Sequence, residues 1–262
     1  MIQISDVSHQ ISGLPILTDV TFTLPKGGIT ALIGPNGAGK STLLSLMARL
    51  SKLQTGAIFF DGVDVSTTPT QALAKRLSIL RQDNSVSARL TVEDLVGFGR
   101  YPHHKGRPTA EDHRLIYAAL EAMALIPLRA RFLDELSGGQ RQRAYVAMVL
   151  AQDTDYVLLD EPLNNLDMKH ARQMMERLRE TARDQGKSFV IVIHDINFAA
   201  AYADRIVALK NGRLHAIGTP KDIVTRPMLK QVFDLDIIVE NIRNLPVAIH
   251  QVAPFPQRQE HT

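Results

Sequence analysis

The segment at residues 34–41 constrains the fold of this chain more than any other. Its sequence, GPNGAGKS, fits the pattern G-x-x-x-x-G-K-[ST] and lies between an apolar run typical of a buried strand, residues 29–33, and a helical pattern at residues 40–50. Glycines in such a loop let successive backbone N–H groups turn toward phosphate oxygens, and the N-terminus of the following helix favours negative charge. We therefore predict a strand–loop–helix unit that cradles the phosphates of a nucleotide.

Two side chains in this loop add specific chemistry. Lys40 is long enough to reach the β- and γ-phosphates, and the hydroxyl of Ser41 is a suitable ligand for Mg²⁺. The predicted nucleotide-binding residues of the loop are Gly34, Pro35, Asn36, Gly37, Ala38, Gly39, Lys40, Ser41 and Thr42.

An apolar run at residues 156–159 ends in two adjacent carboxylates, Asp160 and Glu161. Strands often end in acidic residues, so this feature alone does not identify a site. Downstream of a phosphate-binding loop, however, Asp160 is placed to hold the water shell of Mg²⁺ at the carboxyl edge of a sheet. Glu161 would then point elsewhere and polarise an attacking water molecule.

A third motif, LSGGQRQR at residues 136–143, indicates the family. Ser137 is a natural helix N-cap, and the two glycines after it let a ligand approach the backbone closely. The motif matches the signature of the ATP-binding cassette (ABC) ATPases, which this chain resembles over about residues 1–230. The resemblance implies ATP as the nucleotide, Mg²⁺ as the metal and further nucleotide contacts at Ser137, Gly138, Gly139 and Gln140.

The resemblance extends to three further positions. Gln82, after a predicted strand at residues 77–80, is similar to the Q-loop glutamine, which contacts Mg²⁺ and water and reports to the membrane partner. Leu166 and Asp167 resemble the D-loop, where two cassettes touch, and His194 resembles the switch histidine that contacts the γ-phosphate. On this resemblance the expected catalytic residues are Glu161, His194, Lys40 and Gln82, and the expected Mg²⁺ site is Ser41, Gln82 and Asp160.

The family also implies a fold, an α/β P-loop NTPase cassette with a mixed sheet core, an N-terminal antiparallel β subdomain and a helical subdomain insert. The coarse pattern agrees, because β-type runs open the sequence, residues 91–150 are helical and βα alternation then resumes. We expect a single ATP-binding domain over residues 1–262. Its RecA-like and β core takes about residues 1–85 and 155–240, its helical subdomain about 86–154 and a C-terminal tail 241–262.

Local patterns give more detailed expectations. Thr91 and Thr109 each precede a helical pattern and have a carboxylate three residues on, which favours capped helix starts. Residues 101–108 are expected to form the loop between those helices, and residues 221–233 to be helical. Asn211-Gly212 predicts a type I′ hairpin turn.

One position departs from the family pattern. ABC ATPases usually stack adenine on an aromatic residue just before the second strand, and Ile11 occupies that place here, with His9 two residues earlier. Adenine would therefore rest on an aliphatic surface or on His9, at a cost of up to about 1–3 kcal/mol of stacking free energy.

The chain carries one phosphate loop and one signature. In the family these two motifs face opposite directions, so the resemblance implies that one chain supplies two half-sites. Two copies arranged head to tail would then enclose two ATP molecules in an isologous homodimer.

Composition excludes several classes of protein. The net charge of +3, from 30 Lys and Arg against 27 Asp and Glu, is too small to indicate a nucleic-acid partner. The chain has no cysteine, which excludes thiol catalysis and Cys-ligated metals. No apolar run approaches the roughly 18–20 residues that span a bilayer, and no export signal is visible. We expect a peripheral protein at the cytoplasmic face of the cell membrane.

The short insert and single cassette favour a subunit that serves a separate polytopic membrane permease, rather than a DNA-repair or translation relative. Residues 90–103 and the helix after the signature resemble ATPases of importers for iron–siderophore, haem and cobalamin. Iron–siderophore uptake, with a substrate-binding protein as an indirect partner, is the first expectation. Haem or cobalamin import is an alternative, and so is an ABC-type switch that acts on a ribosome or nucleic acid.

Two remaining pairs of basic side chains are expected to be solvated. His103 and His104 are adjacent on the expected loop without a third ligand nearby, so we expect them to be solvated and predict no structural metal beyond Mg²⁺. Arg141 and Arg143 are likewise expected to be solvated on the signature helix.

Overall fold

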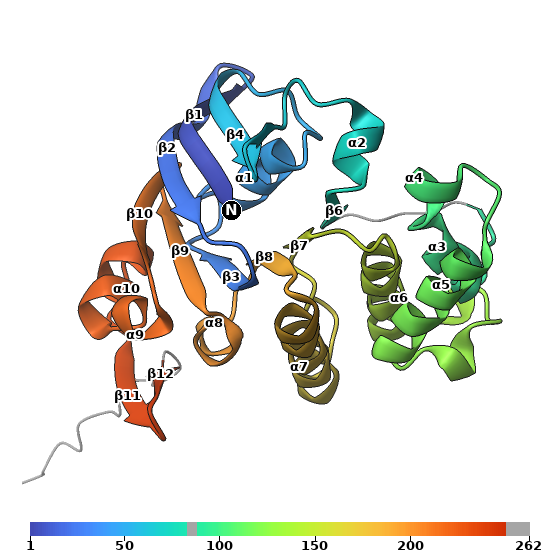
Figure 1. Cartoon of the computed structure of the whole chain (residues 1–262). Helices are drawn as coiled ribbons and strands as arrows, with labels where there is room; N and C mark the ends of the chain where they lie inside the picture. Colours follow the sequence, from blue (N-terminus) through green and yellow to red (C-terminus); the bar gives the residue numbers. More distant parts are fainter. Residues whose placement is uncertain (83–87, 250–262) are drawn as a thin grey trace, which may run out of the picture.

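A computed structural model describes residues 1–82 and 88–249 of the 262-residue chain. Its centre is a six-stranded sheet of order β10-β9-β3-β8-β7-β6 (Figure 1). The five strands from β9 to β6 are parallel, and β10 pairs antiparallel with β9 at one edge. Their bounds are β3 (Gly28–Ile33), β6 (Leu77–Leu80), β7 (Tyr156–Asp160), β8 (Ser188–Val192), β9 (Arg205–Lys210) and β10 (Arg213–Gly218).

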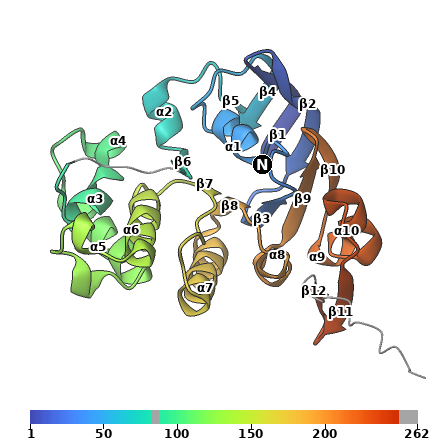
Figure 2. The ribbon, with the colours of Figure 1, turned by 180° about the vertical axis from the view of Figure 1, so that it is seen from behind.

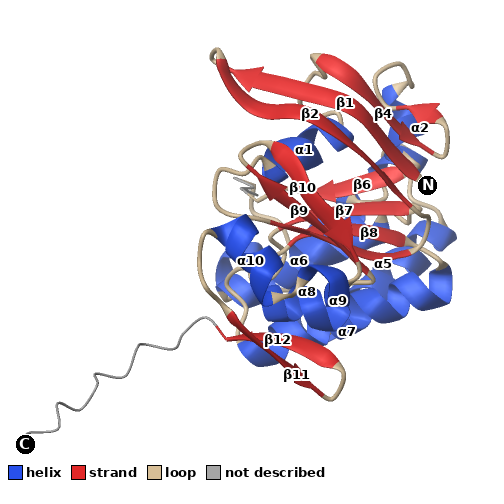
Figure 3. Cartoon of the chain, turned by 90° about the vertical axis from the view of Figure 1, so that its left-hand side faces the viewer, coloured by secondary structure: helices blue, strands red, loops and turns tan. Residues whose placement is uncertain are grey.

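Both faces of this sheet are covered, which is why β7 and β8 are buried along their whole length. Alternate residues of the strands face opposite layers. Val157 and Leu159 pack in one cluster with α7 (Met168–Gln185) and α8 (Ile196–Tyr202), and Leu158 packs in the other with α1 (Lys40–Met47). Figure 3 shows the resulting layers, with helices below the sheet and α1 above it.

A second, four-stranded sheet lies on the far side of α1. It is antiparallel, in the order β2-β1-β4-β5, and consists of β1 (Ile2–Ile11), β2 (Leu14–Leu24), β4 (Thr55–Phe60) and β5 (Val63–Asp64). Clear period-two alternation is limited to residues 2–4 and 20–24 of the sequence. The first two strands are much longer than these runs, because bulges interrupt the alternation without ending the pairing. The expected N-terminal antiparallel subdomain is therefore confirmed.

Between β6 and β7, the described residues from 92 to 151 form a separate group of helices (Figure 2). The group contains α3 (Val92–Phe98), α4 (Tyr101–His104), α5 (Ala110–Ala122), two short 3₁₀ turns (Ile126–Leu128 and Leu133–Glu135) and α6 (Gly138–Ala151). Thr91 and Thr109 cap α3 and α5 in capping boxes, as predicted. The loop expected at residues 101–108 is wrong in part, because Tyr101–His104 forms a helical turn with Pro102 as its second residue, where proline needs no N–H partner.

The short helix α2 (Thr70–Ala74) precedes β6, and two short helices follow β10. The helical stretch predicted at residues 221–233 is divided into α9 (Pro220–Ile223) and α10 (Arg226–Phe233), since Thr225 caps α10 and Pro227 lies in its first turn. The predicted hairpin turn is confirmed, with φ of 49° at Asn211 and 73° at Gly212.

The expected tail at residues 241–262 begins in regular structure instead. A hairpin of β11 (Ile238–Ile242) and β12 (Leu245–Ile249) follows α10 and packs against α8. Asn197 of α8 and Ala248 of β12 exchange two hydrogen bonds that hold it there. The rest of the expected tail, residues 250–262, lies outside the described residues.

Within residues 1–82 and 88–249, no helix combines the length and the apolar character that crossing a bilayer requires.

Candidate active site

The predicted site residues follow four neighbouring strands of the six-stranded sheet. The phosphate loop follows β3, Gln82 follows β6, Glu161 follows β7 and His194 follows β8. Because these strands are parallel, their carboxyl ends lie along one edge of the sheet. A cavity of about 650 Å³ opens at this edge, lined by Ile11, Ile16, Asn36, Gly37, Ala38, Gly39, Lys40, Ser41, Thr42, Gln82, Glu161, Asn164 and His194.

The phosphate loop folds tightly around Lys40, which is only 5% exposed. Its Nζ donates hydrogen bonds to the carbonyl oxygens of Gly34 at 2.8 Å and Pro35 at 2.9 Å. Burial lowers the pKa of Lys40, while the charges of Glu161 and Asp160 oppose that change. Gly34 is required here, because a Cβ on it would lie 2.1 Å from the carbonyl oxygen of Leu209.

Ser41 and Asp160 meet at the inner end of the cavity. The Ser41 hydroxyl donates a hydrogen bond to Asp160 Oδ1 at 3.0 Å. Burial raises the pKa of Asp160 even though this hydrogen bond opposes the increase. Mg²⁺ is a hard cation that prefers oxygen ligands, so this carboxylate and hydroxyl pair fits Mg²⁺. Among the residues that the structure describes, no cluster of three His, Cys, Asp or Glu side chains could hold a metal alone.

Glu161 is held by three side chains. Gln82 donates to its Oε2 at 3.0 Å, Asn164 donates to the same oxygen at 2.6 Å, and His194 Nε2 donates to Oε1. Burial would raise the pKa of Glu161, but the hydrogen bonds from His194 and Asn164 outweigh it, so the net pKa is lowered. Its φ of 51° is in the left-handed region, which is uncommon for a residue other than glycine and clusters at functional sites.

Part of the cavity wall is aliphatic. Ile11, which is 50% exposed at the end of β1, lines the cavity together with Ile16. His9 does not line the cavity, because it lies within β1 and is only 8% exposed. The burial of His9 therefore favours the aliphatic surface over His9 as the predicted adenine contact. Ile11 pairs with Leu14 at the end of β1 and is exposed there, whereas Val7 and His9 are buried further along the strand.

The signature residues lie outside this cavity. Ser137 caps α6, accepting a hydrogen bond from the backbone N–H of Gln140 at 3.3 Å, and the Gln140 side chain accepts one from the Ser137 N–H. Ser137 and Gly138 are exposed. α6 and α1 lie in different parts of the molecule in Figure 1, so one chain does not bring its own signature to its phosphate loop.

The predicted D-loop residues adjoin the signature in the same chain. A Cβ on Gly139 would lie 3.2 Å from Leu166, so this glycine lets the two segments approach closely. Asp167 caps α7, accepting a hydrogen bond from the His170 backbone at 2.8 Å. Within its own chain, Asp167 therefore acts as a helix cap. Its contact with a second cassette stays a prediction.

Sequence reasoning missed Asn164 and Ile16 as cavity residues. Asn164 reaches Glu161 because the chain turns sharply after β7, where Glu161 and Asn165 both have positive φ. An amide three residues after a predicted base was an available signal. Ile16 lies in the long strand β2, and no local pattern marks it as a cavity residue.

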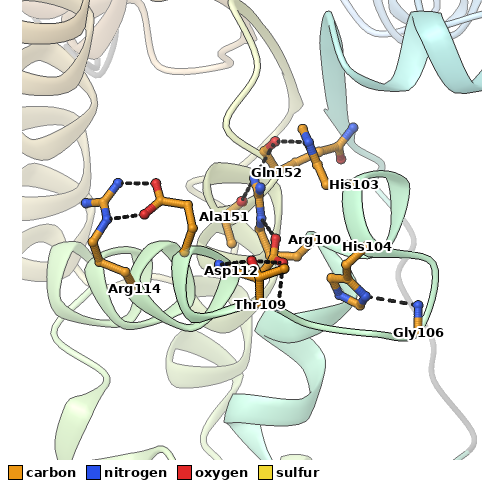
Figure 4. A network of polar contacts seen from close by, with 10 residues as sticks. Arg100, His103, His104, Gly106, Thr109, Asp112, Arg114, Ala151 and Gln152 are labelled. Atoms are coloured by element: carbon orange, nitrogen blue, oxygen red, sulfur yellow. Dashed lines mark hydrogen bonds and ion pairs between the residues drawn. The ribbon is translucent and has the colours of Figure 1, made fainter.

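The histidine pair and the arginine pair that we expected to be solvated make more contacts than expected. His103 is not simply solvated, since its Nε2 donates to the Gln152 carbonyl at 2.9 Å (Figure 4). His104 Nδ1 accepts from the Gly106 N–H. Arg143 is also half-buried rather than solvated, with its Nη1 bonded to the Met123 carbonyl at 3.0 Å. The exposure of Arg141 agrees with the expectation.

Comparison with known proteins agrees with this geometry. A family model described as ABC transporter matches residues 17–164. The petrobactin import ATP-binding protein YclP of Bacillus subtilis (strain 168) is 49% identical over 250 residues, covering 95% of this chain and 99% of the relative.

Two solved structures extend the comparison to three dimensions. A metal-chelate type ABC transporter in an inward-facing conformation aligns with a TM-score of 0.80 and 25% identity, covering 95% of this chain and 98% of that one. A bacterial ABC transporter cassette solved as a dimer aligns with a TM-score of 0.76 and 26% identity, covering 84% of this chain and 99% of that one.

Proposed function

This chain belongs to the ABC transporter family as an ATP-hydrolysing cassette, and from that membership we propose that it drives the import of a ferric siderophore through a separate membrane permease. The observation that carries the proposal is the cavity at the carboxyl edge of the sheet. It brings Lys40, Gln82, Glu161 and His194 together from four strands, as hydrolysis of a nucleotide phosphate requires.

The loop at residues 34–42 is the proposed phosphate-binding element. Its backbone N–H groups and the N-terminus of α1 supply partial positive charge, and Lys40 adds a full charge at the β- and γ-phosphates. Two carbonyl groups of its own loop hold the Lys40 side chain, so it already lies within the loop where the phosphates are proposed to bind. This arrangement limits the conformational entropy that Lys40 loses when it binds phosphate.

Ser41, Gln82 and Asp160 are the proposed Mg²⁺ site. Gln82 donates its amide N–H to Glu161, so its carbonyl oxygen is the atom that would coordinate the cation. When bound, Mg²⁺ would neutralise negative charge on the phosphate oxygens.

Glu161 is the proposed general base. The depressed pKa keeps its carboxylate ionised at neutral pH, so that it can accept a proton from the water that attacks the γ-phosphate. His194 orients the carboxylate through Oε1 and is the proposed γ-phosphate contact. Asn164 and Gln82 fix Oε2 and so restrict the rotation of the carboxylate.

A second copy is proposed to complete each site. The signature residues Ser137, Gly138, Gly139 and Gln140 lie at an exposed helix N-terminus, outside the cavity of their own chain. Such an end suits the phosphates of a nucleotide held by another copy. The dimeric cassette in the comparison supports a head-to-tail homodimer, with Leu166 and Asp167 as its D-loop contact.

The permease is proposed to dock beside the end of β6. Phe98 and Tyr101 are 52% and 59% exposed on α3 and α4, in the helical group that the chain enters after Gln82. Exposed apolar side chains of this size are typical of protein contacts. We propose a peripheral location at the cytoplasmic face of the membrane, with the core at residues 1–85 and 155–240 and the helical subdomain at 86–154.

The choice of cargo rests on the relatives. YclP is named for petrobactin import, and the aligned transporter is of metal-chelate type. A ferric siderophore is therefore the first proposal, while haem and cobalamin remain alternatives. Deleting the gene should abolish uptake of radio-iron-labelled ferric siderophore and spare haem and cobalamin, and re-expression of the intact chain should restore it. Unchanged siderophore uptake would reject this cargo.

A switch that acts on a ribosome or nucleic acid is the competing class. Detergent extraction separates the two, since an importer subunit should co-purify with the membrane fraction and a ribosomal switch with ribosomes. Recovery with ribosomes in the presence of ATP would overturn the transport proposal.

A further inference from the structure

The end of α6 that lies farthest from Ser137 is held by a buried arginine. Arg100 is only 5% exposed, and its Nη1 donates hydrogen bonds to the carbonyl oxygens of Ala151 at 3.0 Å and Gln152 at 3.1 Å (Figure 4). These are among the last carbonyls of the helix, which have no partner within it. A cation at this position also stabilises the helix, because it lies near the negative, C-terminal end of the helix dipole.

The same arginine joins the other helices of the group. Its Nε donates to Asp112 Oδ1 at 2.9 Å, and Asp112 caps α5 through hydrogen bonds with Thr109. His103 of α4 donates to the Gln152 carbonyl as well. Figure 4 shows these side chains converging on the end of α6, so the ends of α4, α5 and α6 are fastened at one place.

The side chain of Gln152 leaves this group and reaches the core. Its Nε2 donates to the carbonyl oxygens of Ala74 at 2.6 Å and Leu77 at 3.1 Å. Ala74 is the last residue of α2, and Leu77 is the first residue of β6, the strand that ends just before Gln82. Gln152 therefore connects the helix that begins with the signature to the strand that ends at the active-site cavity.

We propose that Gln152 is a positioning residue that sets the orientation of α6, and thus of the signature, relative to the core. The inference rests on the proposed function, in which the Ser137 end of α6 meets the nucleotide of a second copy. α6 has 14 residues, so it is about 21 Å long, and a tilt of about 5° at Gln152 displaces Ser137 by about 2 Å. A misplacement of about 1 Å at a reacting centre can cost about a hundred-fold in rate.

The proposal predicts a separation between binding and turnover. The phosphate loop lies in the core and does not depend on Gln152, so nucleotide affinity of the isolated chain should stay within about two-fold. The signature moves with α6, so kcat should fall by about ten-fold or more when Gln152 loses its donors. A loss of general stability would instead weaken both quantities together.

The test uses Gln152→Met, which keeps the length of the side chain and removes both donors, and Gln152→Glu, which keeps the shape and places acceptors against the two carbonyls. Gln173→Met, at an exposed position on α7, is the matched control. Because the chain has no native cysteine, Lys52→Cys on the core and Arg114→Cys on α5 provide two unique sites for spin labels. Pulsed electron paramagnetic resonance then measures the distance between core and helical group.

We expect a single narrow distance distribution in the parent and the control, a broader one in Gln152→Met and the broadest in Gln152→Glu, with kcat falling in the same order. If Gln152→Glu does not fold, the comparison of Gln152→Met with the control decides alone. An unchanged distribution in Gln152→Met would overturn the proposal, and so would a broadened distribution with unchanged kcat. The distance measurement does not require ATP hydrolysis. If the proposed ATPase dimer were wrong, the distance distributions would still report whether Gln152 sets the orientation of α6. Failure of the proposed function can therefore be distinguished from failure of this inference.

Discussion

Gln82 donates a hydrogen bond from its Nε2 to Glu161 Oε2 across 3.0 Å, joining the end of β6 to the end of β7. The two residues are 79 positions apart in sequence, with the whole helical group between them. A displacement of Gln82, where the chain enters the helical group, would therefore act directly on Glu161, the proposed base. This contact gives a physical route by which a docked permease would influence hydrolysis.

Glu161→Gln should abolish turnover and leave nucleotide binding intact. The amide keeps the shape of the side chain but cannot accept a proton from water, so we expect a decrease in kcat of at least about a hundred-fold. The ATP-bound dimer should then accumulate, and size-exclusion chromatography with ATP and Mg²⁺ should detect it. Glu111→Gln, an exposed change on α5, is the control. Hydrolysis near the parent rate would remove Glu161 from the role of base.

Asn164→Ala should shift the pH profile of hydrolysis. Asn164 is one of the donors that lower the pKa of Glu161, so its removal raises that pKa. A base works in its deprotonated form, so the acid limb of kcat/KM should move to higher pH, while the rate at pH 8 changes less. Measuring kcat/KM from about pH 4 to pH 8.5 tests this, because the lowered pKa of Glu161 places the acid limb of the parent below the ordinary glutamate pKa of about 4.3. An acid limb at the parent position would show that Asn164 does not set the pKa.

Ile11→Tyr should tighten nucleotide binding. Ile11 lies on the cavity wall and is half-exposed, so a tyrosine there gains a surface for adenine. Base–aromatic stacking contributes about 1–3 kcal/mol, which corresponds to a decrease in Kd of about 5- to 150-fold. Isothermal titration with a non-hydrolysable ATP analogue measures it, and Ile242→Tyr on the exposed hairpin is the control. An equal or weaker affinity would place adenine elsewhere.

Asp112→Asn should destabilise the helical group. The Arg100–Asp112 pair is almost fully buried, and removing one partner of such a pair costs about 3–5 kcal/mol of unfolding free energy. Asp184→Asn breaks the exposed Arg183–Asp184 pair and should have little effect. Urea denaturation at pH 7 measures both variants. Equal midpoints would contradict the stabilising role of the buried pair.

The same pair predicts an acid dependence of stability. Burial would raise the pKa of Asp112, but hydrogen bonds from Thr109 and the Arg100 charge hold it well below its usual range. A carboxyl with a lowered folded-state pKa stabilises the protein above its unfolded pKa near 3.9, and that contribution disappears as the pH falls further. The parent should therefore lose stability steeply below about pH 4, and Asp112→Asn should lose less. Parallel acid curves for the two proteins would be inconsistent with this linkage.

Several features of this protein could be predicted from its sequence alone. The phosphate loop, the carboxylates after 156–159 and the capped helices depend on local chemistry, in which glycine φ angles, short apolar runs and capping side chains act over a few residues. The order of these motifs also predicted the α/β architecture. Local patterns failed where long-range pairing extends an element, as in β1 and β2, or where packing against α8 orders the hairpin at residues 238–249.

The tertiary structure alone decided which residues meet. Asn164 and Ile16 enter the cavity, and His9 does not, because strand register and the turn after β7 fix the direction of each side chain. The link from Gln152 to β6 spans 75 residues of sequence and has no local signature. The sequence therefore determined which chemistry this protein can perform, and the packing of distant strands and helices decided the geometry, since side chains that are remote in sequence become neighbours only through the fold.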